Sequence, residues 1–133
     1  MYFTDSMVRT IWAYDFDLSA GRPSRRRVFA KLAENDGLPD GLTVDRDGYV
    51  WSAIWDGWRV VRYTPDGAVE REVSLPVQRP TSCTFGGPDL QTLYVTSAST
   101  ELNGHALGKG PLAGALFAVP TDISGIPAVP FGE

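Results

Sequence analysis

A strand pattern recurs three times along the chain, at Met1–Thr4, Tyr49–Ser52 and Leu93–Thr96. Each occurrence is followed by a second matching strand, at Ile11–Tyr14, Val60–Tyr63 and Leu116–Val119. An Asp or Pro-Asp turn closes each unit, at Asp15, Pro65–Gly67 and Pro120 with Asp122. A repeat of roughly 45–50 residues with about four strands per unit is typical of β-propeller blades. The repeat therefore predicts an all-β chain built from blades.

The rest of the sequence agrees with this fold class, because no window of useful length keeps apolar residues at helical spacing. Short runs rich in β-branched and aromatic residues are bounded by Gly, Pro and Asp, as strands are. The candidate strands are Tyr2–Asp5, Thr10–Phe16, Arg26–Leu32, Leu42–Asp45, Tyr49–Ile54, Arg59–Tyr63, Val69–Leu75, Ser82–Phe85, Thr92–Ser97, Ala115–Val119 and Ile126–Val129. Met1 begins at what should be the second strand of a blade. We therefore expect about three blades, the first incomplete, where a closed ring usually has ~4–8.

Charge and composition limit the classes of partner. The 133 residues are enough for one domain with its own core. The formal net charge of −4 argues against a nucleic acid or an anionic membrane as partner. The basic residues Arg22 and Arg25–Arg27 are predicted to form a solvated strand edge rather than a binding patch.

Cysteine content and hydropathy limit the compartment. Cys83 is the only cysteine, so the chain forms no internal disulfide and no thiolate zinc cluster. No segment approaches the ~18 apolar residues of a transmembrane helix. The start, Met1–Asp5, lacks the basic and apolar regions of a signal peptide. We therefore expect a cytoplasmic protein.

The meander of a blade assigns the loops to two opposite ends, because alternate connections of an antiparallel sheet share an end. One end is predicted to collect Ser6–Arg9, Asp36–Gly41, Trp55–Trp58, Arg79–Ser82 and Ser99–Ala113. The other end is predicted to collect Arg46–Gly48, Pro65–Gly67 and Gly87–Gln91. Asp40 should therefore lie at the opposite end of one strand from Asp45 and Asp47.

Asp45 and Asp47 resemble the start of a calcium-binding EF-hand loop, but the pattern stops there. The third oxygen ligand is replaced by Tyr49, and Asp56 stands where the loop needs its last glutamate. The flanking segments are strands and not helices. We therefore interpret Arg46–Gly48 as a hairpin turn in which Gly48 supplies the positive φ.

Six motifs occur in a fixed order along the chain: Tyr2–Ser6, Leu38–Leu42, Asp47–Trp51, Leu75–Val77, Pro80–Gly87 and Leu93–Ala98. Together they resemble the senescence marker protein-30 / gluconolactonase / regucalcin family of six-bladed propellers. The most specific motif is Pro80–Gly87, which reads Pro-Thr-Ser-Cys-Thr-Phe-Gly-Gly. The resemblance covers the C-terminal half of a family member. It implies that residues 1–133 form one partial β-propeller of the six-bladed type.

Members of this family are metal-dependent lactone hydrolases, so the resemblance implies hydrolysis of a sugar lactone to the aldonic acid. It implies one divalent metal ion on the axis, calcium first, with zinc, manganese or iron as alternatives. Of the family's three ligands, only the aspartate of the Pro-Asp-Gly turn matches this chain, as Asp40. The glutamate and the asparagine would lie upstream of Met1, which puts catalysis by this chain alone in doubt. From spacing alone, Pro39–Gly41 is more simply a turn.

The resemblance makes Asp40 both metal ligand and catalytic base, and four further residues are candidates for binding the substrate. Trp55 and Trp58 flank a loop at the predicted end of Asp40, where they either wall a sugar pocket or pack between blades. Thr81 and Ser82 enter the innermost strand of the last blade, where a hydroxyl either faces the axis or caps a turn.

The remaining conspicuous side chains are assigned to structure. Trp12 and Trp51 fall inside strands and are predicted to be core residues. Cys83 is predicted to be a small buried residue and not a nucleophile. His105 lies in the long Gly-rich segment Ser99–Ala113, which is predicted to be a lid or a dimer contact.

Two hypotheses for the function follow. The first is a metal-dependent sugar lactonase whose other half is supplied separately, with a small lactone as substrate. The second is a non-catalytic propeller module that binds calcium or a partner protein. In either case, two copies of the chain could associate to rebuild a six-bladed ring and cover their exposed blade edges.

Overall fold

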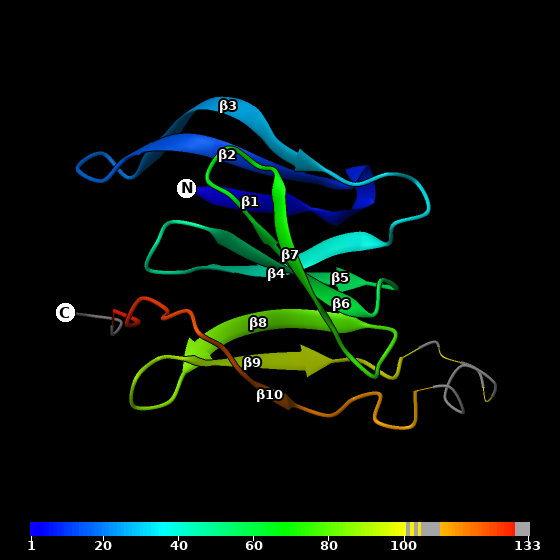
Figure 1. The fold of residues 1–133 in the computed structure, drawn as a ribbon. Helices are drawn as coiled ribbons and strands as arrows, with labels where there is room; N and C mark the ends of the chain where they lie inside the picture. The colour runs from blue at the N-terminus through cyan, green and yellow to red at the C-terminus, as the bar shows by residue number, and fades with distance from the viewer. Residues whose placement is uncertain (101, 103, 105–109, 130–133) are drawn as a thin grey trace.

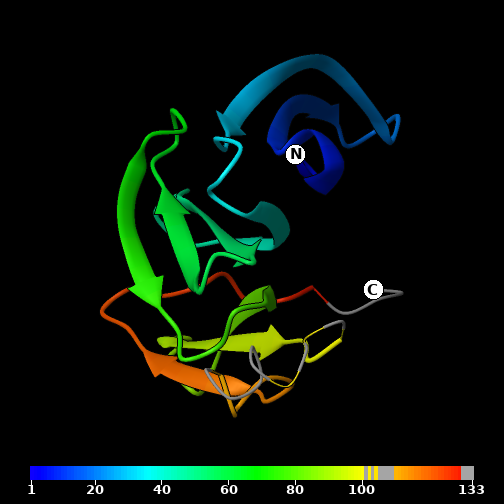
Figure 2. The ribbon, with the colours of Figure 1, turned by 90° about the vertical axis from the view of Figure 1, so that its right-hand side faces the viewer.

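The computed structural model describes residues 1–100, 102, 104 and 110–129. In these residues ten strands form three antiparallel sheets that follow one another along the chain (Figure 1). Viewed after a quarter turn, the sheets fan out in an arc that is open on one side (Figure 2). The chain is therefore all-β, with three blades of a propeller. No helix within the described residues is long and apolar enough to cross a membrane.

The first sheet has three strands in the order β1-β2-β3. They are β1 (Tyr2–Asp5), β2 (Thr10–Asp17) and β3 (Arg22–Lys31), and a short 3-10 helix, η1 (Ser6–Val8), joins β1 to β2. This sheet has one strand fewer than the second one, and the missing strand is the innermost. The expectation that the first blade is incomplete is confirmed.

The basic run lies on β3, the outer edge of this first sheet. Arg25 and Arg27 are exposed, and both pair with Asp15 on β2, at 2.7 Å and 2.9 Å. The run is therefore a solvated strand edge, as predicted.

The second sheet is complete, with four strands in the order β4-β5-β6-β7. They are β4 (Leu38–Val44), β5 (Val50–Trp55), β6 (Arg59–Tyr63) and β7 (Val69–Ser74). The third sheet has β8 (Pro80–Gly86), β9 (Thr92–Ser97) and β10 (Phe117–Pro120), with β8 innermost.

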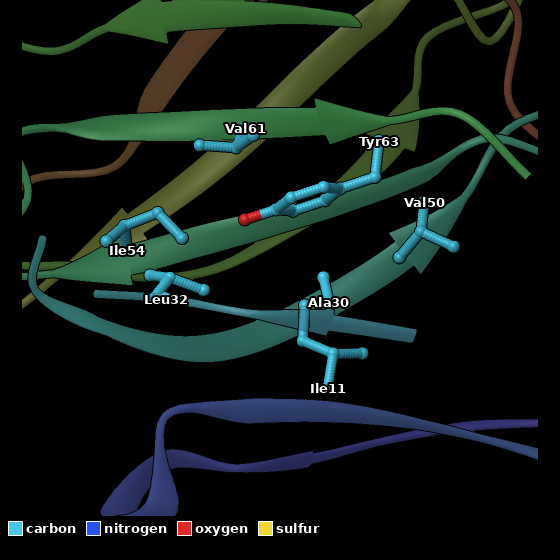
Figure 3. Close-up of a cluster of buried hydrophobic side chains, with 7 residues drawn as sticks. All are labelled: Ile11, Ala30, Leu32, Val50, Ile54, Val61 and Tyr63. Atoms are coloured by element: carbon cyan, nitrogen blue, oxygen red, sulfur yellow. The ribbon is translucent and has the colours of Figure 1, made fainter. Parts of the chain in front are cut away.

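Two apolar layers hold the blades together. The layer between the first and second sheets is drawn in Figure 3 and consists of Ile11, Ala30, Leu32, Val50, Ile54, Val61 and Tyr63. The layer between the second and third sheets consists of Trp51, Val60, Leu75, Val77, Cys83, Leu93 and Val95. Burial of these side chains is the main stabilising contribution to the arc.

The packing corrects the predicted repeat by one residue. Trp51 of β5 packs toward the third sheet, whereas Val50 packs toward the first. In the first sheet Tyr2 packs toward the second, so Tyr2 is the equivalent of Trp51 and not of Val50. By the same alternation Tyr94 lies on the outer face of the third sheet. The predicted repeat matches the Ser/Thr ends of the motifs, and a shift of one residue reverses the face of every side chain.

Two further expectations are wrong. Ile126–Val129 forms no strand. Pro127 within it cannot donate to a sheet ladder, and the chain just before it instead bridges Gly125 to Asp45. Trp12 is half-buried and not a core residue, because no other sheet of the described residues packs on its face of the first sheet. The guanidinium of Arg26 stacks over its ring at 4.6 Å.

Candidate active site

Asp40 lies within β4. The prediction that it lies in a loop before this strand is therefore wrong. Pro39 pairs with Ile54 and Leu42 pairs with Ser52, so Asp40 and Gly41 together oppose a single residue of β5. This is a β-bulge, which bends a strand and re-aims a side chain, often next to an active site. The prediction that Asp40 and Asp45 lie at opposite ends of this strand is confirmed.

The carboxyl group of Asp40 is half-buried and has no opposite charge beside it in the described part of the chain. Burial raises its pKa above the ordinary value, and a hydrogen bond from the Gly41 N–H offsets only part of that rise. The main-chain oxygen of Asp40 accepts a hydrogen bond from Thr4 Oγ1 at 3.0 Å, which ties β4 to the first blade. A partly desolvated, unpaired carboxylate is suited to bind a cation or to accept a proton.

The innermost strands β4 and β8 approach each other closely at Gly41. A Cβ atom at Gly41 would lie 2.3 Å from Ser82 Oγ and 2.8 Å from Ser82 Cα, closer than real atoms approach. Glycine is required here because the two backbones pass close together, not because of its φ angle. The Pro39–Gly41 segment is thus more than a turn.

We expect Gly41→Ala to lower the free energy of unfolding by about 1–3 kcal/mol, because the added methyl overlaps Ser82. Urea unfolding followed by tryptophan fluorescence measures this loss. Ser82→Gly in the same chain should restore part of the stability, since the two contacts with the Ser82 side chain disappear. Strictly additive losses would contradict the close contact.

The loop with the two candidate tryptophans lies at the same end as Asp40, because Trp55 pairs with Leu38. Arg79, from the segment before β8, stacks over the Trp55 ring at 4.6 Å and pairs with Asp56 at 2.7 Å. One face of Trp55 is therefore already occupied by a cation. The prediction that Asp36–Gly41, Trp55–Trp58 and Arg79–Ser82 share one end is confirmed.

Trp58 is half-buried and adopts a positive φ of 58°. Its indole ring lies against Gly110, where a Cβ atom would be 3.5 Å away. Its main-chain N–H donates to Gln78 and its oxygen accepts from Leu75. This residue therefore joins the loop to the connection between β7 and β8, and its ring packs beside the segment that returns to the third sheet.

Thr81 and Ser82 lie in β8, the innermost strand of the third sheet. Thr81 Oγ1 is 2.7 Å from Thr96 Oγ1 on β9. Ser82 is exposed and helps to line a shallow hollow of about 110 Å³ on the outer face of the third sheet, with Thr84, Tyr94, Thr96 and Leu116. The hollow contains neither Asp40 nor the tryptophans, so it is not the predicted pocket.

Asp45 and Asp47, at the other end of β4, do not form a calcium loop. The Asp45 carboxylate is fully buried, and it accepts hydrogen bonds from the N–H groups of Asp47 and Tyr49, from Trp51 Nε1 and from Arg62 Nε. Gly48 has a φ of 84°. The Asp45 side chain thus has its acceptor sites filled by the protein, and the hairpin interpretation is correct.

Cys83 is buried as predicted, with its thiol directed at the main-chain oxygen of Trp51. Burial raises the pKa of this thiol to about 12, so it stays protonated at neutral pH. His105 lies outside the described residues.

The sequence did not identify Thr4, Thr96 or Arg79 as residues that support the site. Thr4 stood inside a motif, but nothing in its spacing indicates a contact with Asp40, 36 positions away. Thr96 contacts Thr81 on the neighbouring strand, and Arg79 contacts Trp55 and Asp56 from the segment before β8. One indication was present in the sequence, for Arg79 alone, because the segment Arg79–Ser82 is predicted at the same end as Asp40.

The residues at this end fit a metal ion only in part. Asp40 offers a hard oxygen ligand with no competing cation, as calcium and magnesium prefer. Within the described ranges, however, no three His, Cys, Asp or Glu side chains gather into a ligand cluster. Any complete metal site therefore needs ligands in addition to Asp40.

Comparisons with known proteins agree with this geometry. The chain is 42% identical over 130 residues to the pentonolactonase XacC of Haloferax volcanii, and 43% identical over 131 residues to an L-arabinolactonase of Azospirillum brasilense. It is 39% identical over 132 residues to regucalcin of Gallus gallus. The matches cover 95–98% of this chain and 43–45% of those relatives. The chain thus spans less than half the length of the relatives it matches.

Solved structures likewise match most of this chain and less than half of their own length. A calcium-binding regucalcin of Agrobacterium tumefaciens superposes with a TM-score of 0.88 at 31% identity, over 94% of this chain and 43% of that one. A luciferin-regenerating enzyme superposes with a TM-score of 0.86 at 33% identity, over 95% of this chain and 43% of that one. The sequence profile of the SMP-30/Gluconolactonase/LRE-like region matches residues 1–99. The chain therefore belongs to the SMP-30/gluconolactonase/LRE-like family.

Proposed function

We propose that the protein takes part in the hydrolysis of a sugar lactone to the aldonic acid, with Asp40 as its catalytic carboxylate. The observation that carries this proposal is the half-buried Asp40 carboxyl, held in a bulge of an innermost strand without a partner cation in the described residues. Relatives named as a pentonolactonase and an L-arabinolactonase support the substrate class.

In this reaction a water oxygen adds to the lactone carbonyl, the ring C–O bond breaks, and the ring oxygen leaves as a hydroxyl group. Asp40 would hold one divalent metal ion, which would polarise the carbonyl and lower the pKa of a bound water. We propose calcium first, since one similar structure is of a calcium-binding protein, with zinc, manganese and iron as alternatives. The second carboxylate oxygen of Asp40 would accept the proton of the attacking water.

We propose that residues 1–133 supply one half of a six-bladed ring, and that the other ligands come from the half that completes it. The share of 43–45% in the relatives supports this proposal. Trp55, Trp58, Thr81 and Ser82 would lie at the substrate end of the completed ring. Within the described residues no strand pairs with the inner edge of β1, and the outer face of the third sheet carries the shallow hollow, so both are candidate contacts for the completing half.

A second copy of the chain is one candidate for that half, because two arcs related by a two-fold axis would cover the open blade faces of both. Exposed apolar side chains on these faces, Phe3 at 54%, Val28 at 55% and Leu116 at 64%, would then be buried. We expect sedimentation equilibrium to give twice the chain mass at micromolar concentration. A well-folded monomer there would refute the dimer and leave a separate upstream half.

The activity is tested with a panel of lactones and metal ions. We expect hydrolysis of a pentono- or gluconolactone above the uncatalysed rate, measured by proton release. Treatment with a chelator should abolish this activity. The assay uses this chain both alone and with any completing half. Absence of turnover with calcium, zinc, manganese and ferrous iron would favour the second function, a calcium- or protein-binding propeller module.

A further inference from the structure

The innermost strands β4 and β8 have the same local construction. In both strands a proline precedes two residues that oppose a single residue of the next strand. In β8 the pair Thr81 and Ser82 opposes Thr96, as the pair Asp40 and Gly41 does on β4. Thr81 is therefore the equivalent of Asp40 in the next blade, and Ser82 is the equivalent of Gly41.

The two bulges also lie side by side. The Gly41 backbone approaches Ser82 so closely that no Cβ atom fits between them. Thr81 is half-exposed and directly precedes Ser82. Thr81 is thus one residue away from the contact between the two bulges, at the same end of the sheets, and its hydroxyl lies 2.7 Å from Thr96 Oγ1.

Two contacts of Thr96 Oγ1 bear on the direction of the Thr81 hydroxyl, and either threonine can be the donor between them. Thr96 Oγ1 has the main-chain oxygen of Ser82 as an acceptor at 3.4 Å and Thr81 Oγ1 as a neighbour at 2.7 Å. A hydroxyl has one proton to donate. If Thr96 donates to the carbonyl, which cannot donate in return, Thr81 must donate to Thr96. In that arrangement the lone pairs of Thr81 Oγ1 are free to accept a hydrogen bond from a ligand.

We propose that Thr81 Oγ1 accepts a hydrogen bond from a ring hydroxyl of the lactone, and so selects hydroxylated lactones over unsubstituted ones. This inference rests on the proposed function, because it takes the substrate to lie beside Asp40. A sugar lactone carries several O–H donors, whereas an unsubstituted lactone of the same ring size has none. A site that hydrogen-bonds a substrate hydroxyl discriminates against the analogue that lacks this donor.

The test compares D-glucono-1,5-lactone with δ-valerolactone, which has the same ring without hydroxyls, on the assembled protein. We expect Thr81→Val to lower kcat/KM for the hydroxylated lactone by about 10- to 100-fold and to leave that for δ-valerolactone unchanged. Thr81→Ser, which keeps the oxygen, should retain the preference. Thr84→Val, an exposed position on the same strand, is the matched control and should change neither value.

Equal losses for both lactones in Thr81→Val would overturn the inference, because Thr81 would then act on a group common to both reactions. No effect on either lactone would overturn it as well. If the wild type hydrolyses neither lactone, the proposed function fails, and gluconate binding detected by saturation-transfer NMR still tests Thr81. In that case loss of the gluconate signal in Thr81→Val, but not in Thr84→Val, supports the acceptor role, and its retention contradicts it.

Discussion

Replacement of Asp45 by asparagine is expected to lower the free energy of unfolding by about 3–5 kcal/mol. The Asp45 carboxylate is fully buried, and its Oδ2 atom accepts hydrogen bonds from Trp51 Nε1 and Arg62 Nε, each at 2.8 Å. An asparagine has only one oxygen. Its N–H₂ group would therefore face either the Trp51 and Arg62 donors or the N–H groups of the turn. It would also remove the buried counter-charge of the Arg62 guanidinium, which would keep only the partly exposed Glu70 and the exposed Asp47 as partners. Urea unfolding of the two proteins measures the difference.

Asp47→Asn is the matched control for this experiment. Asp47 also lies beside Arg62, at 3.5 Å, but its side chain is 62% exposed. Exposed ion pairs contribute at most about 1 kcal/mol, so the control should unfold close to the wild type. Equal losses for the two variants would mean that burial of Asp45 does not determine its contribution. The two aspartates that resemble a calcium loop would then be equivalent after all.

The sequence predicted the all-β blades because the period of the strands and the turn residues between them are local features. The ends of strands were less predictable, since a bulge extends a strand beyond its alternating pattern. β4 begins at Leu38 and not at Leu42 because Pro39–Gly41 continues the ladder in distorted form. No propensity scale distinguishes such a bulge from a loop, because both favour Pro, Asp and Gly.

The register of the repeat was not predictable from the motifs alone. Alignment on their polar ends made Val50 equivalent to Tyr2, whereas the packing makes Trp51 equivalent to it. Trp12 shows the same limit. Its strand was predicted, but the burial of its side chain depends on a blade that would cover the open face of the first sheet, and strand patterns do not contain that information.

For the candidate site, the sequence separated the two ends of β4, and the family resemblance assigned the chemistry to Asp40. The sequence could not reveal the residues that support Asp40, because they are joined through space. Thr4 reaches the Asp40 main chain from another blade, and Gly41 is required by the approach of β8. The sequence shows that these residues are present, but only the fold shows that they are neighbours.

Asp40→Asn is expected to lower kcat for lactone hydrolysis by at least ~10²–10⁴-fold, because the amide can neither accept the proton of water nor replace a charged metal ligand. The same variant should unfold at an equal or higher urea concentration than the wild type. Burial raises the pKa of Asp40, so its charged form costs folding free energy at neutral pH, and asparagine removes that cost.

The two readouts together separate a catalytic role from a structural one. A residue that merely supports the fold would lose activity and stability in parallel, whereas Asp40→Asn should lose activity alone. Asp89→Asn, an exposed aspartate in the segment Gly87–Gln91, is the control and should change neither quantity. Calcium binding measured by calorimetry on the assembled protein should also weaken in Asp40→Asn and persist in the control. Full retention of activity in Asp40→Asn would move the chemistry to the completing half of the ring, and this carboxylate would then remain an unexplained cost to the fold.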